Sequence, residues 1–265
     1  NKVTGIFAQA KIISNNQINL KLADESEKII EADNIVIATG SSSASLPGID
    51  INENNIVSST GALSLKKVPE RLVIIGGGYI GLELGSVWSR LGSNVTVIEY
   101  LEKIAPGLDG ELSAQFEKIL KKQGINFLLG SKVTGTKEIA EGINVDIENV
   151  ATSETSSLET DVVLVSTGRV PNTDGLFDES LGVKLNEKGF IKTDKNYRTD
   201  VTGIWAIGDV IEGPMLAHKA EEEGVAVAEL IKGKPGHVNY GIIPSVVYTC
   251  LLYTSPSPRD SDSSR

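Results

Sequence analysis

A glycine-rich stretch between residues 73 and 99, VIIGGGYIGLELGSVWSRLGSNVTVIE, has the residue types and spacing that bind a dinucleotide. Gly76, Gly78 and Gly81 form a G-x-G-x-x-G pattern that follows an apolar run and opens a helical one. In such a pattern the first glycine permits a tight turn, the second lets the backbone approach a pyrophosphate, and the third lets helix and strand pack closely. Unpaired N–H groups and the dipole at the helix N-terminus favour the negative charge of the pyrophosphate. The alternative is a glycine-rich turn that binds nothing.

Glu99 ends the second apolar run of this stretch, roughly 20 residues after the glycines, where a ribose-binding acid is expected. A carboxylate at that position accepts hydrogen bonds from both ribose hydroxyls and repels a 2′-phosphate. The residues that follow, YLEKIAPG, contain no arginine that would neutralise such a phosphate. The sequence therefore favours NAD over NADP, and Lys103 keeps NADP open as the alternative.

Strands and helices alternate along the chain, which predicts an α/β fold with parallel sheets. Three apolar runs, IVIATG, VVLVSTG and IWAIGD, each end in a glycine loop and are expected to be buried strands, with residues 35–38 buried on both faces. Ligands of open α/β sheets bind at the carboxyl ends of such strands. Residues 3–30 alternate apolar and polar around Asn15–Asn16, a pattern typical of an antiparallel meander.

Helical spacing of apolar residues predicts helices near residues 59–65, 79–91, 111–123 and 217–232. In the last of these, Glu221 to Glu223 are expected to form a solvated face. The apolar residues that mark the 79–91 helix are Ile80, Leu84, Val87, Trp88 and Leu91.

Composition limits the classes of function. The 265 residues carry 25 Lys and Arg against 35 Asp and Glu, a formal net charge of −10, so a phosphate backbone would be repelled and nucleic acid is not expected as a partner. No stretch reaches the roughly 18 consecutive apolar residues of a membrane helix. The single cysteine, Cys250, allows neither an internal disulfide nor a metal cluster, and it fits a reducing compartment. No metal site is predicted.

Asp209, in the stretch GIWAIGDV, is not explained by NAD. It follows a strand and a glycine, and it is placed to accept a hydrogen bond from a polyol such as the ribityl chain of a flavin. The alternative is that Asp209 caps the next helix. Residues 39–41, Thr-Gly-Ser, hold a similar position after an earlier strand. His237 lies in a Gly- and Pro-containing connector and is expected at the surface.

These motifs together resemble the pyridine-nucleotide–disulfide oxidoreductases, and within that family the dihydrolipoamide dehydrogenases. The resemblance covers about residues 3–249, and MLAHKAEEEG is its most specific part because related reductases share only the glycine motifs. The stretches that carry it are IVIATGS, VIIGGGYIGLELGSVWSRLGSNVTVIE, STGRVPNT, IWAIGDV and PMLAHKAEEEG.

The resemblance implies that this chain contacts two cofactors, FAD and NAD. Asp209 would bind the ribityl chain, Glu99 the adenosine ribose, and Glu83 would lie near the nicotinamide. Tyr79 would cover the nicotinamide site, and the alternative is that it serves only in helix packing. His218 would lie near the flavin, and the alternative, if its motif is left aside, is an ordinary partly buried histidine. The implied FAD contacts are Thr39, Gly40, Ser41, Asp209, Met215, Leu216, Ala217 and His218, and the implied NAD contacts are Gly76, Gly77, Gly78, Tyr79, Ile80, Gly81, Leu82, Glu83, Glu99, Val133 and Gly168.

The resemblance also implies an NAD-binding Rossmann-like domain inserted in a split FAD-binding domain that carries a β-meander. The chain lacks the C-x4-C redox disulfide and the histidine–glutamate pair of the family, so we expect an internal piece with no catalytic residue of its own. The domains expected are the last part of the FAD domain at 1–43, the NAD domain at 44–169, a central FAD-contacting segment at 170–237, the first strand of a dimer-interface domain at 238–249, and a disordered or artefactual tail at 250–265.

The activity implied for the parent is oxidation of protein-bound dihydrolipoamide through a redox disulfide and FAD, with hydride passed to NAD. Its partner would be the lipoyl domain of a 2-oxo-acid dehydrogenase or glycine-cleavage complex, and the parent would be a homodimer in the cytoplasm or a mitochondrial matrix. This chain alone is expected to be inactive, to bind NAD weakly and to hold FAD poorly. The alternatives are an NADP-linked or mercuric-type reductase of the same family and a non-catalytic NAD-binding module.

Overall fold

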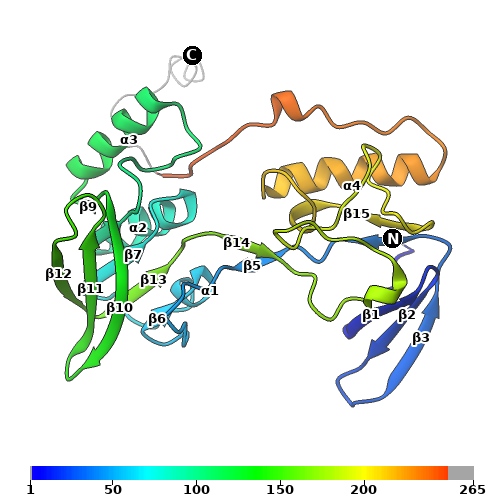
Figure 1. Cartoon of the computed structure of the whole chain (residues 1–265), viewed down its shortest axis with the longest axis horizontal. Helices are drawn as coiled ribbons and strands as arrows, with labels where there is room; N and C mark the ends of the chain where they lie inside the picture. The colour runs from blue at the N-terminus through cyan, green and yellow to red at the C-terminus, as the bar shows by residue number, and fades with distance from the viewer. Residues whose placement is uncertain (1, 250–265) are drawn as a thin grey trace, which may run out of the picture. The chain divides into compact units, whose positions relative to one another are not determined.

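A computed structural model describes residues 2–249, which belong to two compact units (Figure 1). The first unit comprises Asn1–Ser42 and Arg169–Pro244, and the second comprises Ser43–Gly168 and Ser245–Arg265. The second unit is therefore inserted in the first along the chain. The tail prediction for residues 250–265 lies outside the described residues.

The second unit is built on a five-stranded parallel sheet with the strand order β6-β13-β7-β8-β9. Its central strand β7 carries apolar side chains on both faces, as expected for a buried parallel strand. The strands are β6 (Ile56–Val57), β7 (Arg71–Ile75), β8 (Asn94–Ile98), β9 (Asn126–Leu128) and β13 (Val162–Val165).

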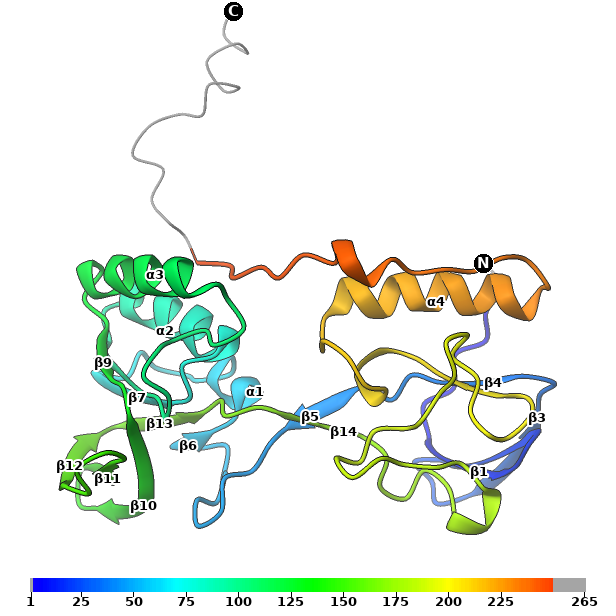
Figure 2. The ribbon, with the colours of Figure 1, turned by 45° about the horizontal axis from the view of Figure 1, so that its top comes forward.

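The two faces of this sheet are covered by different elements. Leu72 and Ile74 of β7 belong to a core that contains residues of the helices α1 (Ser59–Ala62), α2 (Tyr79–Leu91) and α3 (Gly110–Lys122). Figure 2 shows α2 and α3 on one side of β7. Val73 and Ile75, which alternate with them, point into a core formed with an antiparallel sheet. That sheet consists of β10 (Ser131–Ile139), β11 (Gly142–Asn149) and β12 (Thr155–Thr160).

Helix α2 has the bounds predicted from the sequence, and Gly81 packs against the sheet as predicted, but two of the apolar residues that mark the helix do not lie on its buried face. Val87 and Leu91 are 42% and 56% exposed, whereas Gly81, Leu82, Gly85, Ser86 and Trp88 are buried. The reason is close packing: a methyl group on Gly85 would stand 2.7 Å from Ile74 Cδ1 of the underlying strand. The glycines face the sheet because only they allow that approach.

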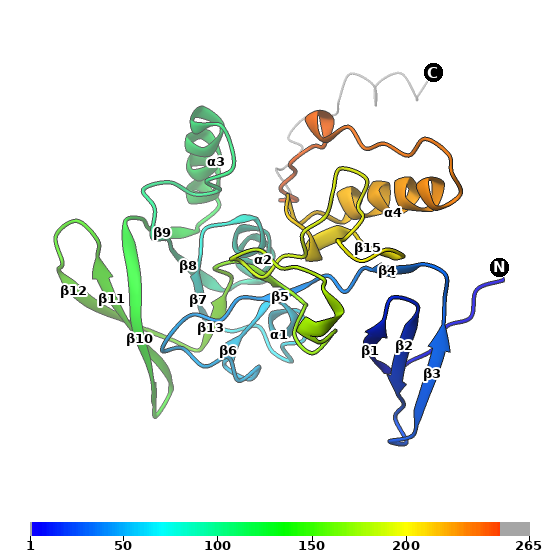
Figure 3. The same cartoon turned by 45° about the vertical axis from the view of Figure 1, so that its right-hand side comes forward.

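The first unit opens with the predicted antiparallel meander, which turns at Asn15–Asn16 (Figure 3). Two short strand pairs and a long helix follow, with 3₁₀ turns at η1 (Glu179–Leu181), η2 (Gly208–Val210) and η3 (Tyr240–Ile242). The other elements are β1 (Gln9–Ser14), β2 (Gln17–Lys21), β3 (Glu27–Glu31), β4 (Ile35–Ile37), β5 (Ser41–Ser43), β14 (Arg169–Pro171), β15 (Ile204–Ala206) and α4 (Ala217–Ile231).

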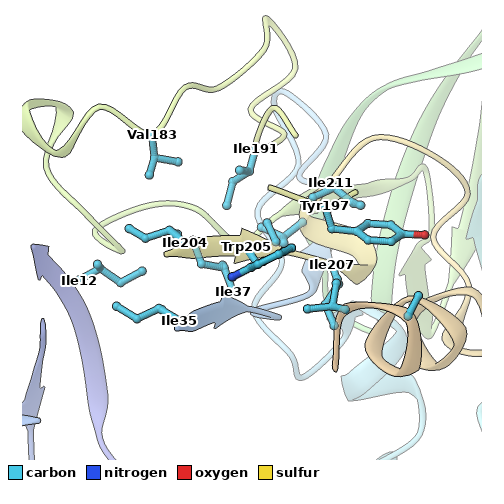
Figure 4. Close-up of a cluster of buried hydrophobic side chains, with 14 of the residues drawn as sticks. Ile12, Ile35, Ile37, Val183, Ile191, Tyr197, Ile204, Trp205, Ile207 and Ile211 are labelled. Atoms are coloured by element: carbon cyan, nitrogen blue, oxygen red, sulfur yellow. The ribbon is translucent and has the colours of Figure 1, made fainter. Parts of the chain in front are cut away.

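The core of the first unit gathers around β4 and β15, which pair in parallel (Figure 4). Ile35 and Ile37 lie in this core next to Ile204 and Trp205. Val36, between the two isoleucines, is 39% exposed, so the prediction that this strand is buried on both faces is wrong for the described chain. Among the described residues the strand has a single partner, β15, and its second face is only partly covered.

The prediction of a strand in residues 238–249 is also wrong. The described part of this segment contains the 3₁₀ turn η3 and otherwise irregular backbone. A strand needs a neighbour to pair its N–H and C=O groups, and this segment has none among the described residues. Across residues 2–249, no helix combines the length and the apolar character that crossing a bilayer requires.

Candidate functional site

The glycine turn between β7 and α2 is tightly constrained on its protein side. Gly76 has φ +107°, a backbone conformation that side-chain-bearing residues rarely adopt. A methyl group on it would stand 2.6 Å from the carbonyl oxygen of Ser166, at the end of β13. A methyl group on Gly81 would overlap the carbonyl oxygen of Gly76. These two glycines are needed for the turn itself and for packing of helix on strand.

Gly78 is different, because it faces open space. Apart from its two chain neighbours, no described residue lies within 4 Å of the point where its Cβ would stand, and its backbone is extended at φ −79° and ψ −179°. It is the N-cap of α2, and among the described residues no side chain bonds to the free N–H groups of the first turn. An uncapped helix N-terminus with bare backbone beside it fits a pyrophosphate.

Glu99 lies beside this turn and is only 8% exposed. Its Oε2 accepts a hydrogen bond from Gly77 N at 2.6 Å, and its Oε1 accepts one from Leu101 N at 2.8 Å. Each carboxylate oxygen has a second lone pair that remains for the hydroxyl of a ribose. A 2′-phosphate would meet a buried negative charge held in place by two backbone donors, so the geometry fits NAD better than NADP.

The other residues predicted to contact NAD are distributed around this turn in the second unit. Tyr79 places its hydroxyl against the loop after β8, where a methyl group on Gly107 would be 2.8 Å from Tyr79 Oη. Glu83, one turn into α2, accepts a hydrogen bond from Tyr248 N at 2.7 Å. Val133 is half-buried beside the core that faces the antiparallel sheet, and Gly168 has φ +151°. Their contact with nicotinamide or ribose stays a prediction.

The first unit brings Ser41 and Asp209 together, although 168 residues separate them. Ser41 Oγ donates a hydrogen bond to Asp209 Oδ2 at 2.6 Å. Arg169 donates from Nε to Ser41 Oγ and from Nη2 to Ser41 O, both at 2.6 Å, and its Nε lies 4.0 Å from Asp209 Oδ2. The result is a half-buried carboxylate, hydroxyl and guanidinium at the carboxyl end of β15 and beside β4.

A second contact ties the same loop to the strand that returns from the inserted unit. Thr39 Oγ1 donates to Asn172 O at 2.7 Å, and Asn172 Nδ2 donates to Thr39 O at 2.9 Å. Ser42 Oγ adds a hydrogen bond to Asn172 Oδ1 at 2.7 Å. Sequence reasoning did not single out Arg169 or Asn172, although both lie in the STGRVPNT motif that it quoted.

The alternative that Asp209 caps a helix is wrong. Asp209 lies inside η2, and its carboxylate bonds to Ser41 rather than to a helix N-terminus. Helix α4 begins after Leu216, whose side chain makes no capping hydrogen bond. Met215 and Leu216 are half-buried ahead of this helix, and His218 Nε2 lies 3.0 Å from Pro244 O. His237 is exposed, as predicted.

The prediction of a solvated face at Glu221 to Glu223 holds for Glu221 and Glu222 and is wrong for Glu223. Glu223 is fully buried and so is Lys219, one turn before it; their Nζ and Oε1 atoms lie 3.2 Å apart. A signal in the sequence was missed: Lys219, Glu223, Ala226 and Val227 recur at i, i+4, i+7 and i+8, which is the spacing of a buried helix face. The charge of Glu223 predicts exposure to solvent, whereas its position in this periodic pattern predicts burial.

Comparison with known protein families identifies the family of this chain. Residues 1–224 match the model of the family described as pyridine nucleotide-disulphide oxidoreductase. The chain belongs to this family. Its α/β fold with a parallel sheet and the resemblance read from its motifs are thereby confirmed.

Individual relatives narrow the resemblance. The chain is 53% identical over 251 residues to a mitochondrial dihydrolipoyl dehydrogenase of Dictyostelium discoideum, covering 94% of this chain and 51% of that protein. It is 51% identical over 249 residues to mitochondrial dihydrolipoyl dehydrogenase 1 of Arabidopsis thaliana, covering 94% and 49%. The solved HOCl-induced flavoprotein disulfide reductase RclA of Escherichia coli aligns with a TM-score of 0.78 at 30% identity, covering 88% and 51%.

The chain thus spans about half the length of the curated relatives it matches. Members of the family use FAD and a nicotinamide cofactor, and both clusters described above offer the chemistry those groups need. One is a bare helix N-terminus with a buried ribose-accepting carboxylate, and the other is a hydrogen-bonded carboxylate at a strand end.

Proposed function

We propose that the complete protein containing this chain is a dihydrolipoyl dehydrogenase, which oxidises protein-bound dihydrolipoamide and reduces NAD through FAD. The observation that carries the NAD assignment is the buried Glu99, bonded to Gly77 N and Leu101 N beside an uncapped helix N-terminus. The substrate assignment is supported by relatives of about half identity that bear this name.

The chain's residues would act in this reaction by binding and orientation. FAD, when bound, accepts electrons from thiols and supplies hydride to NAD. Gly78 and the first turn of α2 would hold the pyrophosphate of NAD, and Glu99 its adenosine ribose. Glu83 and Tyr79 would lie at its nicotinamide end, and Val133 and Gly168 would add contacts. Asp209 and Ser41 would bind the hydroxyls of the ribityl chain, with residues 39–40 and 215–218 beside the flavin.

The two units support the proposed division into domains. The second unit would be the NAD domain, predicted at 44–169, and the first unit would contain the end of the FAD domain, predicted at 1–43, together with the central segment 170–237. Residues 238–249 would begin the dimer-interface domain. The partners would be a second copy of the protein and a lipoyl domain of a 2-oxo-acid dehydrogenase or glycine-cleavage complex, in the cytoplasm or the mitochondrial matrix.

The likeness to a disulfide reductase favours one other candidate, a reductase of the same family that uses NADP. Glu99 opposes this alternative, because its carboxylate would repel a 2′-phosphate. The residues that follow Glu99, YLEKIAPG, contain no arginine that could pair with such a phosphate. The other alternative, a non-catalytic NAD-binding module, would bind NAD through the second unit and would not oxidise a dithiol.

The test is a steady-state assay of the complete native protein with dihydrolipoamide and either NAD or NADP, following formation of the reduced nucleotide. We expect turnover with NAD and at least about a hundredfold lower kcat/KM with NADP, because a buried carboxylate opposes the 2′-phosphate. A preference for NADP would support the reductase alternative. Nucleotide binding without turnover of dihydrolipoamide would support the non-catalytic module.

A further inference from the structure

Helix α4 carries two charged side chains with no solvent exposure, Lys219 and Glu223. They form an i,i+4 ion pair with 3.2 Å between Lys219 Nζ and Glu223 Oε1. Removing two charges from water is costly, and such a pair is maintained only where further hydrogen bonds satisfy both groups. The partners that supply these bonds therefore indicate what the pair does.

Both members of the pair bond to one residue, Gly208. Gly208 N donates to Glu223 Oε2 at 2.7 Å, and Lys219 Nζ donates to Gly208 O at 3.0 Å. Gly208 has φ +75°, and a methyl group on it would stand 3.2 Å from Ala220 Cβ, so the turn lies directly on the helix. The ion pair thus holds the N–H and the C=O of a single left-handed glycine.

Tyr240, from the segment after α4, completes the network. Its hydroxyl donates to Glu223 Oε1 at 2.6 Å, and it shares a hydrogen bond with the hydroxyl of Tyr197 at 3.0 Å. Each oxygen of the Glu223 carboxylate therefore has a hydrogen-bond donor besides the ammonium group: Gly208 N on Oε2 and the phenol on Oε1. A carboxylate restrained in this way cannot rotate without breaking a buried bond.

Asp209 directly follows Gly208, the residue to which the ion pair bonds. The carboxylate of Asp209 makes no hydrogen bond with the pair among the described residues, and its Oδ2 accepts one from Ser41 Oγ at 2.6 Å. We propose that Lys219, Glu223 and Tyr240 form a positioning unit that sets the Gly208–Asp209 turn so that Asp209 can bind the hydroxyl groups of a flavin ribityl chain. The inference rests on the proposed function and assigns the three residues a role in cofactor binding through Asp209.

The experiment is a double-mutant cycle on FAD affinity, measured by titrating FAD into the apoprotein of the complete native protein. One arm is K219M/E223Q, which removes both charges together and leaves no buried charge unpaired. The other arm is D209A, and the third variant combines the two. E117Q/K121M is the matched control, because Glu117 and Lys121 form an i,i+4 ion pair on α3 in the second unit, with the lysine 54% exposed.

If the ion pair acts through Asp209, K219M/E223Q weakens FAD binding about tenfold, the factor that corresponds to losing one hydrogen bond of ordinary strength. The same substitutions then change affinity less than about twofold in the D209A background, since the group they position is gone. The control variant binds FAD as the unsubstituted protein does.

Equal weakening in both backgrounds would mean that the pair only maintains the fold, and it would overturn the positioning role. Unchanged affinity of K219M/E223Q would overturn it as well. In both cases the proposed function survives, because the unsubstituted protein binds FAD. Failure of the unsubstituted protein to bind FAD would overturn the proposed function and the inference together.

Discussion

Gly78 and Gly81 belong to the same motif but differ in the space around them, and this difference can be tested at the scale of single residues. Gly81 has no room for a methyl group because the carbonyl oxygen of Gly76 occupies that space, whereas a methyl group on Gly78 would meet no described residue within 4 Å apart from the two chain neighbours. The backbone of Gly78 is one that alanine adopts readily. Its glycine is therefore not needed by the folded chain, and the free space fits an approaching pyrophosphate.

We predict that G78A lowers NADH affinity about tenfold or more while the free energy of unfolding changes by less than about 1 kcal/mol. G81A is expected to cost about 3 kcal/mol or more, because backbone must move to admit the methyl group. NADH titration and urea denaturation measure the two effects. G110A is the control, since Gly110 also opens a helix and also faces free space. Unaltered NADH binding by G78A would show that the pyrophosphate binds elsewhere.

Tyr240 gives a second prediction at this scale. Burial, followed by the hydrogen bond to Glu223, raises the pKa of its phenol above the ordinary value. Since the neutral phenol is the form that the fold stabilises, its contribution is fully present below about pH 10, the pKa in the unfolded chain, and is lost as the pH rises further. Y240F should cost about 1 kcal/mol near neutral pH, a low value because the residue is half exposed. The Tm difference between the two proteins should shrink in alkali, and a pH-independent difference would contradict this account.

At the scale of elements, an ion pair between Arg71 and Asp161 joins the start of β7 to the residue before β13. Arg71 donates to Asp161 Oδ1 from Nη2 at 2.8 Å and from Nε at 3.2 Å, and Arg71 N donates to Oδ2 at 2.9 Å. Burial acts to raise the pKa of Asp161, but the hydrogen bonds and the charge of Arg71 outweigh it and lower the pKa below its usual value. A lowered carboxyl pKa contributes stability above about pH 4 and loses it as the pH falls.

D161N should therefore lower the free energy of unfolding by about 1 kcal/mol at neutral pH, a value reduced because both side chains are about one-third exposed. The difference from the unsubstituted protein should shrink below about pH 4, where the carboxylate of the unfolded chain is protonated. Urea denaturation at neutral and at acid pH measures it. An effect of equal size at both pH values would mean that shape, not charge, maintains the contact.

The ends of helices could be predicted from the sequence where local residue patterns determine them. The helix Tyr79–Leu91 begins at a glycine turn and ends before Gly92, which has φ +112°, and both signals are local. The packing of Gly81 against the strand followed as well, but the exposure of Val87 and Leu91 did not, because it depends on how the helix lies on the sheet. Burial of Lys219 and Glu223 depends on Gly208, which lies 11 residues before the lysine, and on Tyr240, which follows the helix. The Asp209–Ser41 contact joins residues 168 apart, so motif matching suggested it but no local rule could place it.

At the scale of the whole molecule, the chain order separates the two groups of residues that we propose bind cofactors. The residues proposed to bind NAD all lie within the inserted segment, Ser43–Gly168, whereas Ser41, Arg169 and Asp209 come from both sides of the insertion. If NAD binds to residues of one continuous segment, that segment can make these contacts without the rest of the protein. The Asp209 cluster combines both flanking segments, and the chain spans about half the length of the relatives it matches.

This division predicts how the 265-residue chain behaves when it is produced alone. It should bind NADH, weakly, and retain little FAD. It should not oxidise dihydrolipoamide, because exchange with a dithiol needs a redox disulfide and the sequence has a single cysteine. Fluorescence titration with NADH, the flavin absorbance of the purified chain and an NAD-linked assay measure the three properties, with the complete protein as the positive control. Stoichiometric flavin in the purified chain would mean that the Asp209 cluster and its neighbours suffice for FAD, and the requirement for additional chain would then be wrong.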